Sequence, residues 1–349
     1  MLHVIGYMLD VIHMPHRSAK QIFQAIQKAK KILLVSHKNP DGDTLGSLAA
    51  MMQYLQHIEK PYVAFCATTM SPNLLFLPHI AHMSQDKTLW DDAEIDLVIS
   101  FDCSSPEYAG IDSYLPILRE RGVTVANIDH HKTNPDFGDL NLVIPNASST
   151  TEILYDFFVY NNIAIHADMA TCLLTGIITD TGNFTNAGTT KHAIDIASKL
   201  IERGGNLSLI QGWVLKDKTV KGLKLWGTVL GRMAHHEPLD IVYTYVTRED
   251  AQKHGVGESE MEGIANFMNH IKDGRAGMIL KEAEDGSFKG SFRTTHDHVD
   301  VSAFAKLFGG GGHAKAAGFS VEGPLEHAIA HIFEKIYMFE KGGMVLDET

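Results

Sequence analysis

The chain has 349 residues, and 44% of them are hydrophobic, so it is long enough for about two globular domains and too apolar for a disordered protein. Its 30 basic and 42 acidic residues give a net charge of -12, which argues against a protein that binds long nucleic acid. Three cysteines without CxxC spacing argue against a disulfide framework and indicate a cytoplasmic protein.

The first 17 residues carry no recognisable targeting signal. They lack the basic start of a signal peptide, and no run in the chain is long and apolar enough to span a membrane. This segment is therefore interpreted either as an extension at the start site or as a strand added at a sheet edge.

Helices and strands alternate over the first 200 residues or so. The first expected elements are the helix Ser18–Lys30, the strand Ile32–Val35, the helix Leu45–Ile58 and the strand Tyr62–Cys66. Such alternation is typical of an α/β fold with a doubly wound, mostly parallel sheet. We predict this first domain over residues 18–203.

Acidic or His residues follow four short apolar runs that are interpreted as buried parallel strands. The runs are Ile32–Val35, Leu97–Ser100, Val123–Ile128 and Leu173–Ile178. The ligand-type residues that follow them are His37, Asp41, Asp43, Asp102, His130 and Asp180. Because the carboxyl ends of parallel strands meet at one crevice, we expect these side chains to converge. Carboxylate and imidazole together suit a divalent cation such as Mn²⁺ or Mg²⁺.

Six such residues are more than one ion needs, which favours two ions that share a carboxylate. Two-metal sites activate a water molecule and stabilise the attacking and leaving oxygens in phosphoryl chemistry. Two local alternatives stay open. Asp43 is also placed to be a helix N-cap. Ser148, Ser149 and Thr150 are placed either to cap the helix Thr151–Tyr160 or to lie near a phosphate.

The pattern changes after residue 203. Residues 204–236 predict a helical connector, in which Leu209, Trp213, Leu223 and Trp226 suit either an interdomain contact or a homodimer. Residues 237–340 predict a smaller α/β domain. Its expected elements are β hairpins from Ile241–Val246, Ala276–Glu282 and Ser287–Arg293, a helix over Ser302–Phe308 and a Gly-rich loop at 309–312.

The second domain contains residues suited to bind an anion. Arg293 can grip a phosphate with two parallel hydrogen bonds. The Gly-rich loop lets backbone N–H groups approach an anion closely. The expected substrate-binding residues are Ser291, Arg293, Gly310, Gly311, Gly312 and His313.

Together these motifs resemble the DHH phosphoesterase superfamily, which is named for a run like Asp129-His130-His131. The segment Gly309–His313 is similar to the signature of the DHH-associated second domain. The resemblance spans about residues 20 to 335. It implies an active site in a cleft between the two domains, where the second domain holds the nucleotide away from the metals.

The resemblance also implies a role for each residue. His37 and Asp41 would hold one metal, Asp43, His130 and Asp180 would hold the other, and Asp102 would bridge them. Asp129 would orient a ligand His, and His131 would face the substrate phosphate or the leaving group, so the implied catalytic residues are Asp102, Asp129 and His131. The resemblance implies two Mn²⁺ ions, whereas the ligands alone also allow Mg²⁺ and do not exclude Zn²⁺.

Within the superfamily the chain resembles the RecJ-like branch, and in particular its compact type with two activities. This type is an oligoribonuclease for very short RNA and a phosphatase for 3′-phosphoadenosine 5′-phosphate (pAp). We therefore expect short RNA or nucleotide bisphosphates as partners, and neither long duplexes nor membranes. The acidic charge, the lack of a preceding membrane or sensor domain and the short stretch after the Gly-rich domain favour this type over a RecJ exonuclease.

Three other functions stay open. The first is a cyclic di-AMP or linear dinucleotide phosphodiesterase. The second is a manganese inorganic pyrophosphatase, which shares the metal motifs but would be expected to have several cations in the second domain instead of a Gly-rich loop. The third is a non-catalytic nucleotide sensor, which would have lost ligands, and none of the six is missing.

Overall fold

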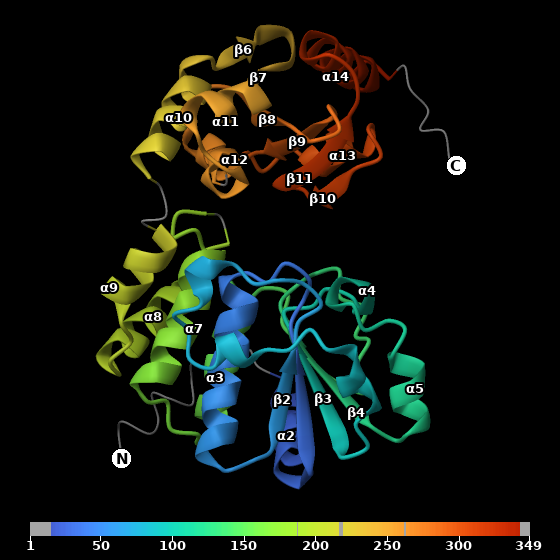
Figure 1. Cartoon of the computed structure of the whole chain (residues 1–349), viewed down its shortest axis with the longest axis vertical. Coiled ribbons are helices and arrows are strands. Elements are labelled where there is room, and N and C mark those ends of the chain that lie inside the picture. The colour runs from blue at the N-terminus through green and yellow to red at the C-terminus, as the bar shows by residue number, and fades with distance from the viewer. Residues whose placement is uncertain (1–14, 187, 216–218, 262, 343–349) are drawn as a thin grey trace. The chain divides into compact units, whose positions relative to one another are not determined.

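The structure is a computed structural model that describes residues 15–186, 188–215, 219–261 and 263–342 (Figure 1). The chain divides into two units, residues 1–217 and 218–349, and each has its own sheet. The possible extension or edge strand at the N-terminus falls mostly in residues 1–14, outside the described part. None of the described helices is long and apolar enough to cross a membrane.

A five-stranded sheet lies at the centre of the first unit, in the order β2-β1-β3-β4-β5. The strands are β1 (Lys31–Val35), β2 (Tyr62–Phe65), β3 (Ile95–Phe101), β4 (Thr124–Asp129) and β5 (Leu140–Val143). Every neighbouring pair is parallel, as predicted. The strand order reverses between β1 and β3, and open α/β sheets bind ligands at the carboxyl ends of strands beside such a reversal.

Helices cover both faces of this sheet, which confirms the doubly wound fold. Ile32 and Leu34 of β1 pack into the core on one face, and Leu33 and Val35 into the core on the other. The first face carries α2 (His16–Lys28), α3 (Gly42–His57), α6 (Thr150–Tyr160), α7 (Ala167–Asp180), α8 (Lys191–Glu202) and α9 (Leu207–Ile210). The second face carries α4 (Pro106–Ala109) and α5 (Leu115–Glu120).

The strand predicted at Leu173–Ile178 is wrong, because this run lies inside helix α7. A continuous apolar run fits a buried strand and a buried helix equally well. Helix α7 packs against α3, α6, α8 and α9, so that all its residues from 169 to 178 are buried. Glycines allow the close approach to α3, since a Cβ on Gly46 would lie 2.5 Å from the Cys172 carbonyl oxygen. Asp180 therefore ends a helix and does not follow a fourth strand.

The second unit contains a six-stranded mixed sheet in the order β10-β11-β9-β8-β7-β6. Its strands are β6 (Ala234–His236), β7 (Ile241–Val246), β8 (Ala276–Glu282), β9 (Phe288–Arg293), β10 (Gly311–His313) and β11 (Ala316–Val321). Strands β8 and β9 form the expected hairpin, but β7 and β8 are parallel. Parallel pairing requires a crossover, and this one contains α11 (Arg248–His254) and α12 (Ile264–Phe267).

Helices also cover the second sheet. Helices α13 (Val301–Lys306) and α14 (Leu325–Glu340) pack on one face around a core that includes Phe292. On the other face, Leu225 and Val229 of α10 (Val220–Gly231) pack against Ile279 of β8. The part of residues 204–236 that forms α10 is thus packed into the second unit. The Gly-rich loop continues into β10, because Gly311 and Gly312 pair with β11.

Candidate metal centre

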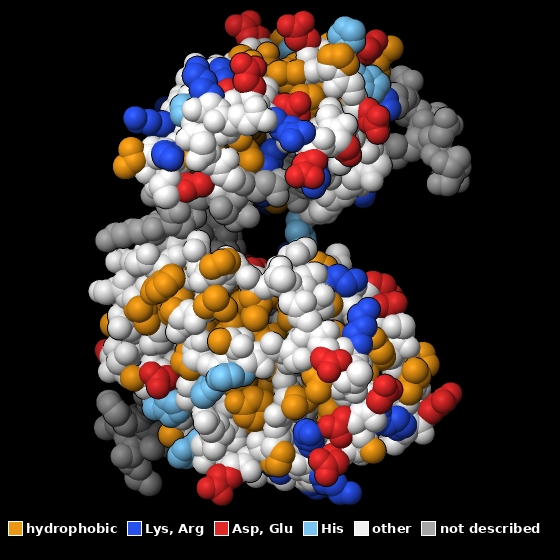
Figure 2. All heavy atoms as spheres, viewed as in Figure 1, with side chains coloured by type: hydrophobic (Ala, Val, Ile, Leu, Met, Phe, Trp, Pro, Cys, Tyr) orange, Lys and Arg blue, Asp and Glu red, His pale blue; other side chains and the backbone are white. Residues whose placement is uncertain are grey.

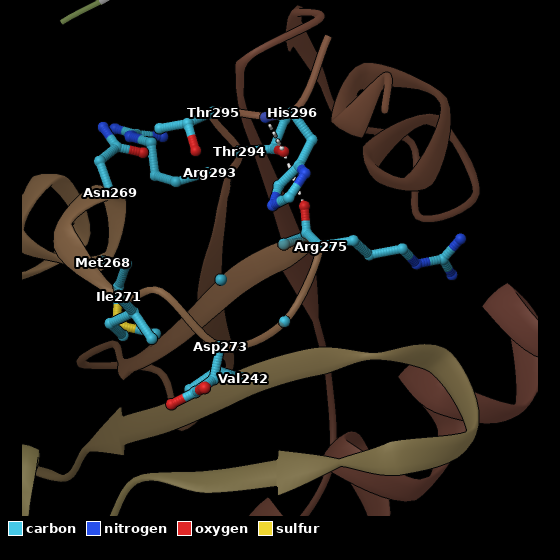
Figure 3. A pocket seen from close by; sticks show the side chains of 13 residues that line it. Val242, Met268, Asn269, Ile271, Asp273, Arg275, Arg293, Thr294, Thr295 and His296 are labelled. Carbon is cyan, nitrogen blue, oxygen red and sulfur yellow. Dashed lines mark hydrogen bonds between the residues drawn. The ribbon is translucent and has the colours of Figure 1, made fainter. Parts of the chain in front are cut away.

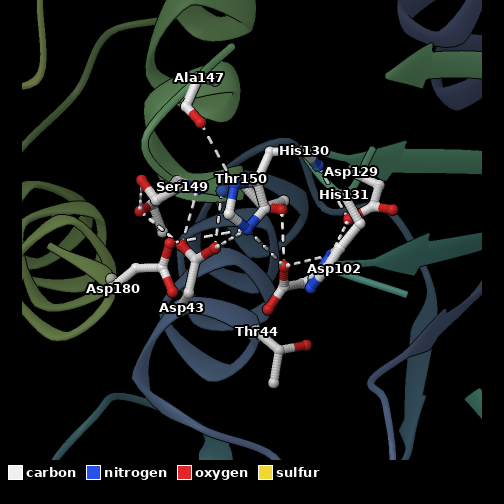
Figure 4. Close-up of polar contacts among 12 residues, drawn as sticks. Asp43, Thr44, Asp102, Asp129, His130, His131, Ala147, Ser149, Thr150 and Asp180 are labelled. Carbon is white, nitrogen blue, oxygen red and sulfur yellow. Dashed lines mark hydrogen bonds and ion pairs between the residues drawn. The ribbon is translucent and has the colours of Figure 1, made fainter. Parts of the chain in front are cut away.

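Seven carboxylate and imidazole side chains of the first unit converge near the carboxyl ends of β1, β3 and β4. Figure 4 shows the part of this cluster around Asp43, Asp102, His130, His131 and Asp180. Ligand atoms of His37, Asp41 and Asp102 all lie within 4.8 Å of one another. The same holds for Asp43, His130 and Asp180, and for Asp102, His130 and His131. The residues predicted to be metal ligands therefore lie together in one cluster, although Asp180 comes from a helix.

Asp102 lies between the two groups. Its Oδ2 is 3.5 Å from His37 Nε2, and its Oδ1 is 3.4 Å from His130 Nε2. Its backbone φ of 60° is left-handed, which is uncommon for a residue with a side chain. The two oxygens of this buried carboxylate thus face different groups, as a bridging ligand requires.

The start of helix α3 orients the first carboxylates. Asp41, not Asp43, is the N-cap: Asp41 Oδ1 accepts from the N–H groups of Asp43 at 3.0 Å and Thr44 at 3.1 Å. The side chain of Asp41 stays 56% exposed, whereas Asp43 in the first turn is buried. The cap leaves Asp43 free to point toward His130, whose Nε2 is 4.0 Å from Asp43 Oδ2.

The N-terminus of α6 holds two of these carboxylates, which the sequence did not reveal. The Thr150 and Thr151 N–H groups donate to Asp43 Oδ2 and Oδ1 at 2.6 and 2.9 Å. The Thr151 hydroxyl donates to Asp43 Oδ1 at 2.7 Å, and the Thr150 hydroxyl donates to Asp102 Oδ1 at 3.0 Å. Of the hydroxyl residues that were expected either to cap this helix or to lie near a phosphate, Ser149 is the cap. Thr150 instead contacts the carboxylates of the cluster. The only sequence signal was the run of hydroxyl residues at the start of α6.

The Asp129-His130-His131 run is fixed by its own hydrogen bonds. Asp129 Oδ1 accepts from His131 Nδ1–H at 2.7 Å and from the His130 backbone N–H at 2.8 Å. Asp129 Oδ2 accepts from Asn134 Nδ2 at 2.5 Å, a contact that sequence reasoning missed. His130 Nδ1–H donates to the Ala147 carbonyl at 3.3 Å, which turns its Nε2 toward the carboxylates. Such second contacts fix the tautomer of a metal-ligand His.

Burial and neighbouring charges shift the pKa values of the buried carboxylates in the cluster. Burial, followed by the charges of Asp102 and Asp180, raises the pKa of Asp43 well above its usual value. Burial raises the pKa of Asp180 to about 7, with His130 opposing the rise. Burial acts in the same direction on Asp102, but hydrogen bonds from His130 and His37 hold its pKa well below the usual range.

The pKa values of the three imidazoles are also raised, because neighbouring carboxylates favour their protonated forms. Burial disfavours a charged His37, but Asp102 and Asp41 outweigh it and raise its pKa to about 10. Burial is likewise outweighed at His130, where Asp102 raises the pKa well above its usual value. At His131 the hydrogen bond to Asp129 outweighs burial and raises the pKa. The neighbouring carboxylates thus favour the protonated form of each histidine, and a bound cation would displace such protons.

The donor set fits divalent cations. Among the described residues, Asp41, Asp43, Asp102 and Asp180 form ion pairs with histidines and with no Lys or Arg. Buried carboxylates need compensating charge, and oxygen and imidazole nitrogen donors suit Mn²⁺, Mg²⁺ or Zn²⁺. The arrangement can hold cations and place a phosphate beside them.

The expected substrate-binding residues of the second unit lie on neighbouring strands. Positions pair across β10, β11 and β9 in two rows, His313–Ala316–Arg293 and Gly311–Gly318–Ser291. Since side chains alternate along a strand, these two rows share one face. Gly312 belongs to the opposite face, and a Cβ there would lie 2.6 Å from the Ala316 carbonyl oxygen. A Cβ on Gly310 would lie 2.2 Å from the Gly318 carbonyl oxygen, so both glycines are needed for close strand packing.

Arg293 lines a small pocket of the second unit (Figure 3). Its Nε donates to Asn266 Oδ1 at 3.2 Å, and its Nη1 donates to the Phe292 carbonyl at 3.0 Å. In Figure 3 the side chain lies next to Asn269 and Thr295. These acceptors hold the guanidinium in one orientation.

Comparisons with known proteins match both units. A model described as the DHH family, N-terminal domain, matches residues 31–177, and the DHHA1 domain matches residues 239–340. The bifunctional oligoribonuclease and PAP phosphatase NrnA of Thermus thermophilus is 28% identical over 322 residues, which cover 92% of this chain and 93% of that protein. The protein of the same name from Bacillus subtilis is 25% identical over 304 residues, covering 86% of this chain and 92% of the relative.

A solved structure shares the fold. The exopolyphosphatase-related protein from Bacteroides fragilis superposes with a TM-score of 0.84 at 24% identity, over 94% of this chain and 98% of that chain. The two family models match both units, and the matched residues include every motif from which the resemblance was inferred except Asp180. The chain therefore belongs to the DHH phosphoesterase superfamily, with a DHH domain followed by a DHHA1 domain.

Proposed function

We propose that this protein is a metal-dependent phosphoesterase that hydrolyses short oligoribonucleotides and pAp. The observation that carries the proposal is the cluster of carboxylates and imidazoles in which Asp102 faces both groups. Both NrnA relatives are named for these two activities and align over most of their length. The net charge of -12 also favours short substrates over long nucleic acid.

In this proposal the cluster holds two Mn²⁺ ions, and Mg²⁺ is an alternative. His37 and Asp41 hold one ion, Asp43, His130 and Asp180 hold the other, and Asp102 contacts both. When bound, such ions activate water and neutralise charge that develops on phosphoryl oxygens. The hydrogen bonds from Thr150 and Thr151 hold the carboxylates of Asp43 and Asp102 in place.

His131 is proposed to act on the substrate directly. Asp129 accepts from its Nδ1–H, which orients the ring and stabilises its protonated form. A protonated His131 can donate from Nε2 to a phosphoryl oxygen or to the leaving oxygen as negative charge develops there. Asn134 fixes the second oxygen of Asp129, so the pair keeps one orientation.

The second unit is proposed to bind the rest of the substrate. Arg293 offers a guanidinium for a second phosphate or a terminal phosphate. Ser291, Gly311 and His313 share its sheet face, and the small residues there leave space for a nucleotide. Gly310 and Gly312 keep β10 close to β11, so that backbone N–H groups of this segment can approach an anion.

The test is hydrolysis of a substrate panel by purified protein with Mn²⁺, Mg²⁺ or no added metal. The panel contains RNA of two to five nucleotides, pAp, cyclic di-AMP and pyrophosphate. We expect turnover of short RNA and pAp that requires metal and is abolished in Asp102→Ala and His130→Ala. A matched control is His192→Gln, since His192 also pairs with an Asp but lies outside the cluster.

Three other outcomes of this assay would indicate a different function. Turnover of pyrophosphate alone would indicate a pyrophosphatase, and preference for cyclic di-AMP would indicate a cyclic dinucleotide phosphodiesterase. Tight nucleotide binding without turnover in any metal would contradict the enzyme and favour a sensor.

A further inference from the structure

Tyr108 is a half-exposed aromatic residue that contacts His37, one of the side chains of the candidate metal centre. It belongs to the short helix α4 and is 41% exposed. Its ring stacks on the imidazole of His37, with ring centroids 4.7 Å apart and an interplanar angle of 20°. A large aromatic side chain therefore stands between solvent and a residue proposed to hold metal.

The position of Tyr108 is held by the backbone on both sides of the contact. The Lys38 backbone N–H donates to the Tyr108 carbonyl at 3.0 Å, and Lys38 Nζ donates to the Glu107 carbonyl at 2.7 Å. Ser105 caps the helix, and Gly110 ends it with a φ of 73° that a residue with a side chain would rarely adopt. The ring is thus presented at the cluster by a fixed segment.

His37 does not need this ring for its orientation. Its Nδ1–H donates to the Lys38 carbonyl at 2.8 Å, which already directs Nε2 toward Asp41 and Asp102. Orientation of His37 therefore does not explain why a partly exposed aromatic ring lies at this position.

We infer that Tyr108 binds the nucleoside attached to the scissile phosphate, by contact of its ring with the base. The inference rests on the proposed function, in which the scissile phosphate binds beside His37, the residue on which the ring of Tyr108 stacks. Stacking of a base on an aromatic side chain strengthens binding by roughly 5- to 150-fold and tolerates every base. Tyr108 would thereby let the enzyme accept short RNA of any sequence and favour nucleotides over inorganic phosphates.

The test compares KM, kcat and Mn²⁺ affinity in the wild type, Tyr108→Phe and Tyr108→Leu. The substrates are the dinucleotide pApA and two versions that lack either the first or the second base. We expect Tyr108→Leu to raise KM for pApA about tenfold, and Tyr108→Phe to change it little because the ring remains. For the version that lacks the contacted base, the wild type and Tyr108→Leu should have the same KM.

Tyr337→Leu is the matched control, because Tyr337 is 45% exposed on α14 of the other unit and should leave all values unchanged. An equal KM rise on all three substrates, or no rise, would overturn the inference. Lower Mn²⁺ affinity and kcat with an unchanged KM would also overturn it, since Tyr108 would then only position His37. Absence of dinucleotide hydrolysis by the wild type would instead reject the proposed function and this inference with it.

Discussion

The hydroxyl of Thr151 donates to Asp43 Oδ1 at 2.7 Å, across 108 positions of sequence. The backbone N–H of Thr151 donates to the same oxygen at 2.9 Å. The start of helix α6 therefore stabilises a buried negative charge in the cluster, as helix N-termini commonly do.

Loss of the Thr151 hydroxyl should weaken metal binding. We expect Thr151→Val to lower Mn²⁺ affinity roughly tenfold, because residues that orient metal ligands typically contribute that much. The affinity is measured by Mn²⁺ titration of metal-free protein. Thr175→Val is the control, since its buried hydroxyl donates only within helix α7, to the Thr171 carbonyl. Equal affinities of the two variants would contradict the role of Thr151.

The left-handed backbone at Asp102 should carry a measurable strain. A residue with a side chain at a φ of 60° is disfavoured by roughly 1–2 kcal/mol relative to glycine. We therefore expect metal-free Asp102→Gly to be about 1 kcal/mol more stable than Asp102→Ala, measured by chemical denaturation. Both variants lack the carboxylate, so their difference reports the backbone.

Asp129 provides the comparison for this strain. It belongs to strand β4 and is not among the described residues with positive φ. Here the glycine variant should be the less stable one, since glycine loses more conformational entropy on folding. The same order of stability at both positions would rule out strain at Asp102.

Gly176 makes room for the cluster inside helix α7. A Cβ at this position would lie 2.4 Å from the Thr151 side chain and 2.6 Å from Asp43 Oδ1. Gly176→Ala should therefore lower the free energy of unfolding by about 1–3 kcal/mol, as overpacking does, and also reduce Mn²⁺ affinity. Gly227→Ala in helix α10 is the control, because a Cβ there meets nothing within 4 Å. It should stabilise the protein by up to about 1 kcal/mol, and a similar gain at Gly176 would contradict the close packing.

His192 and Asp156 should make stability depend on pH. His192 Nε2–H donates to Asp156 Oδ2 at 2.9 Å, and this hydrogen bond raises the pKa of His192 although burial opposes the rise. The pair therefore stabilises the folded state fully below the unfolded pKa of about 6.5. Its contribution is lost as the pH rises through the higher folded-state pKa.

The corresponding variant is His192→Gln. It should lose about 1 kcal/mol of the free energy of unfolding at pH 6 and less at pH 9, measured by chemical denaturation of variant and wild type side by side. A loss that grows with pH would show that the folded-state pKa is not raised.

Much of the first sheet could be predicted because its signals are local. The runs at β1, β3 and β4 are short, apolar and followed at once by polar residues, and carboxyl ends of parallel strands meet at one edge. That geometry is why the cluster of His37, Asp102 and His130 could be anticipated without coordinates. Asp180 was expected in the same cluster for a wrong reason, as the end of a strand, and it reaches the cluster from helix α7.

The sequence by itself determined the family, the alternation of helices and strands and the chemical types of the cluster, since these depend on residue identity and short spacing. Only the tertiary structure decided that Leu173–Ile178 is helical, that Thr150 and Thr151 hold Asp43 and Asp102, and that Tyr108 stacks on His37. The physical reason is that burial on all sides removes the periodicity that separates helix from strand. Contacts between segments far apart in the chain, such as the one between Thr151 and Asp43, leave no local pattern to read.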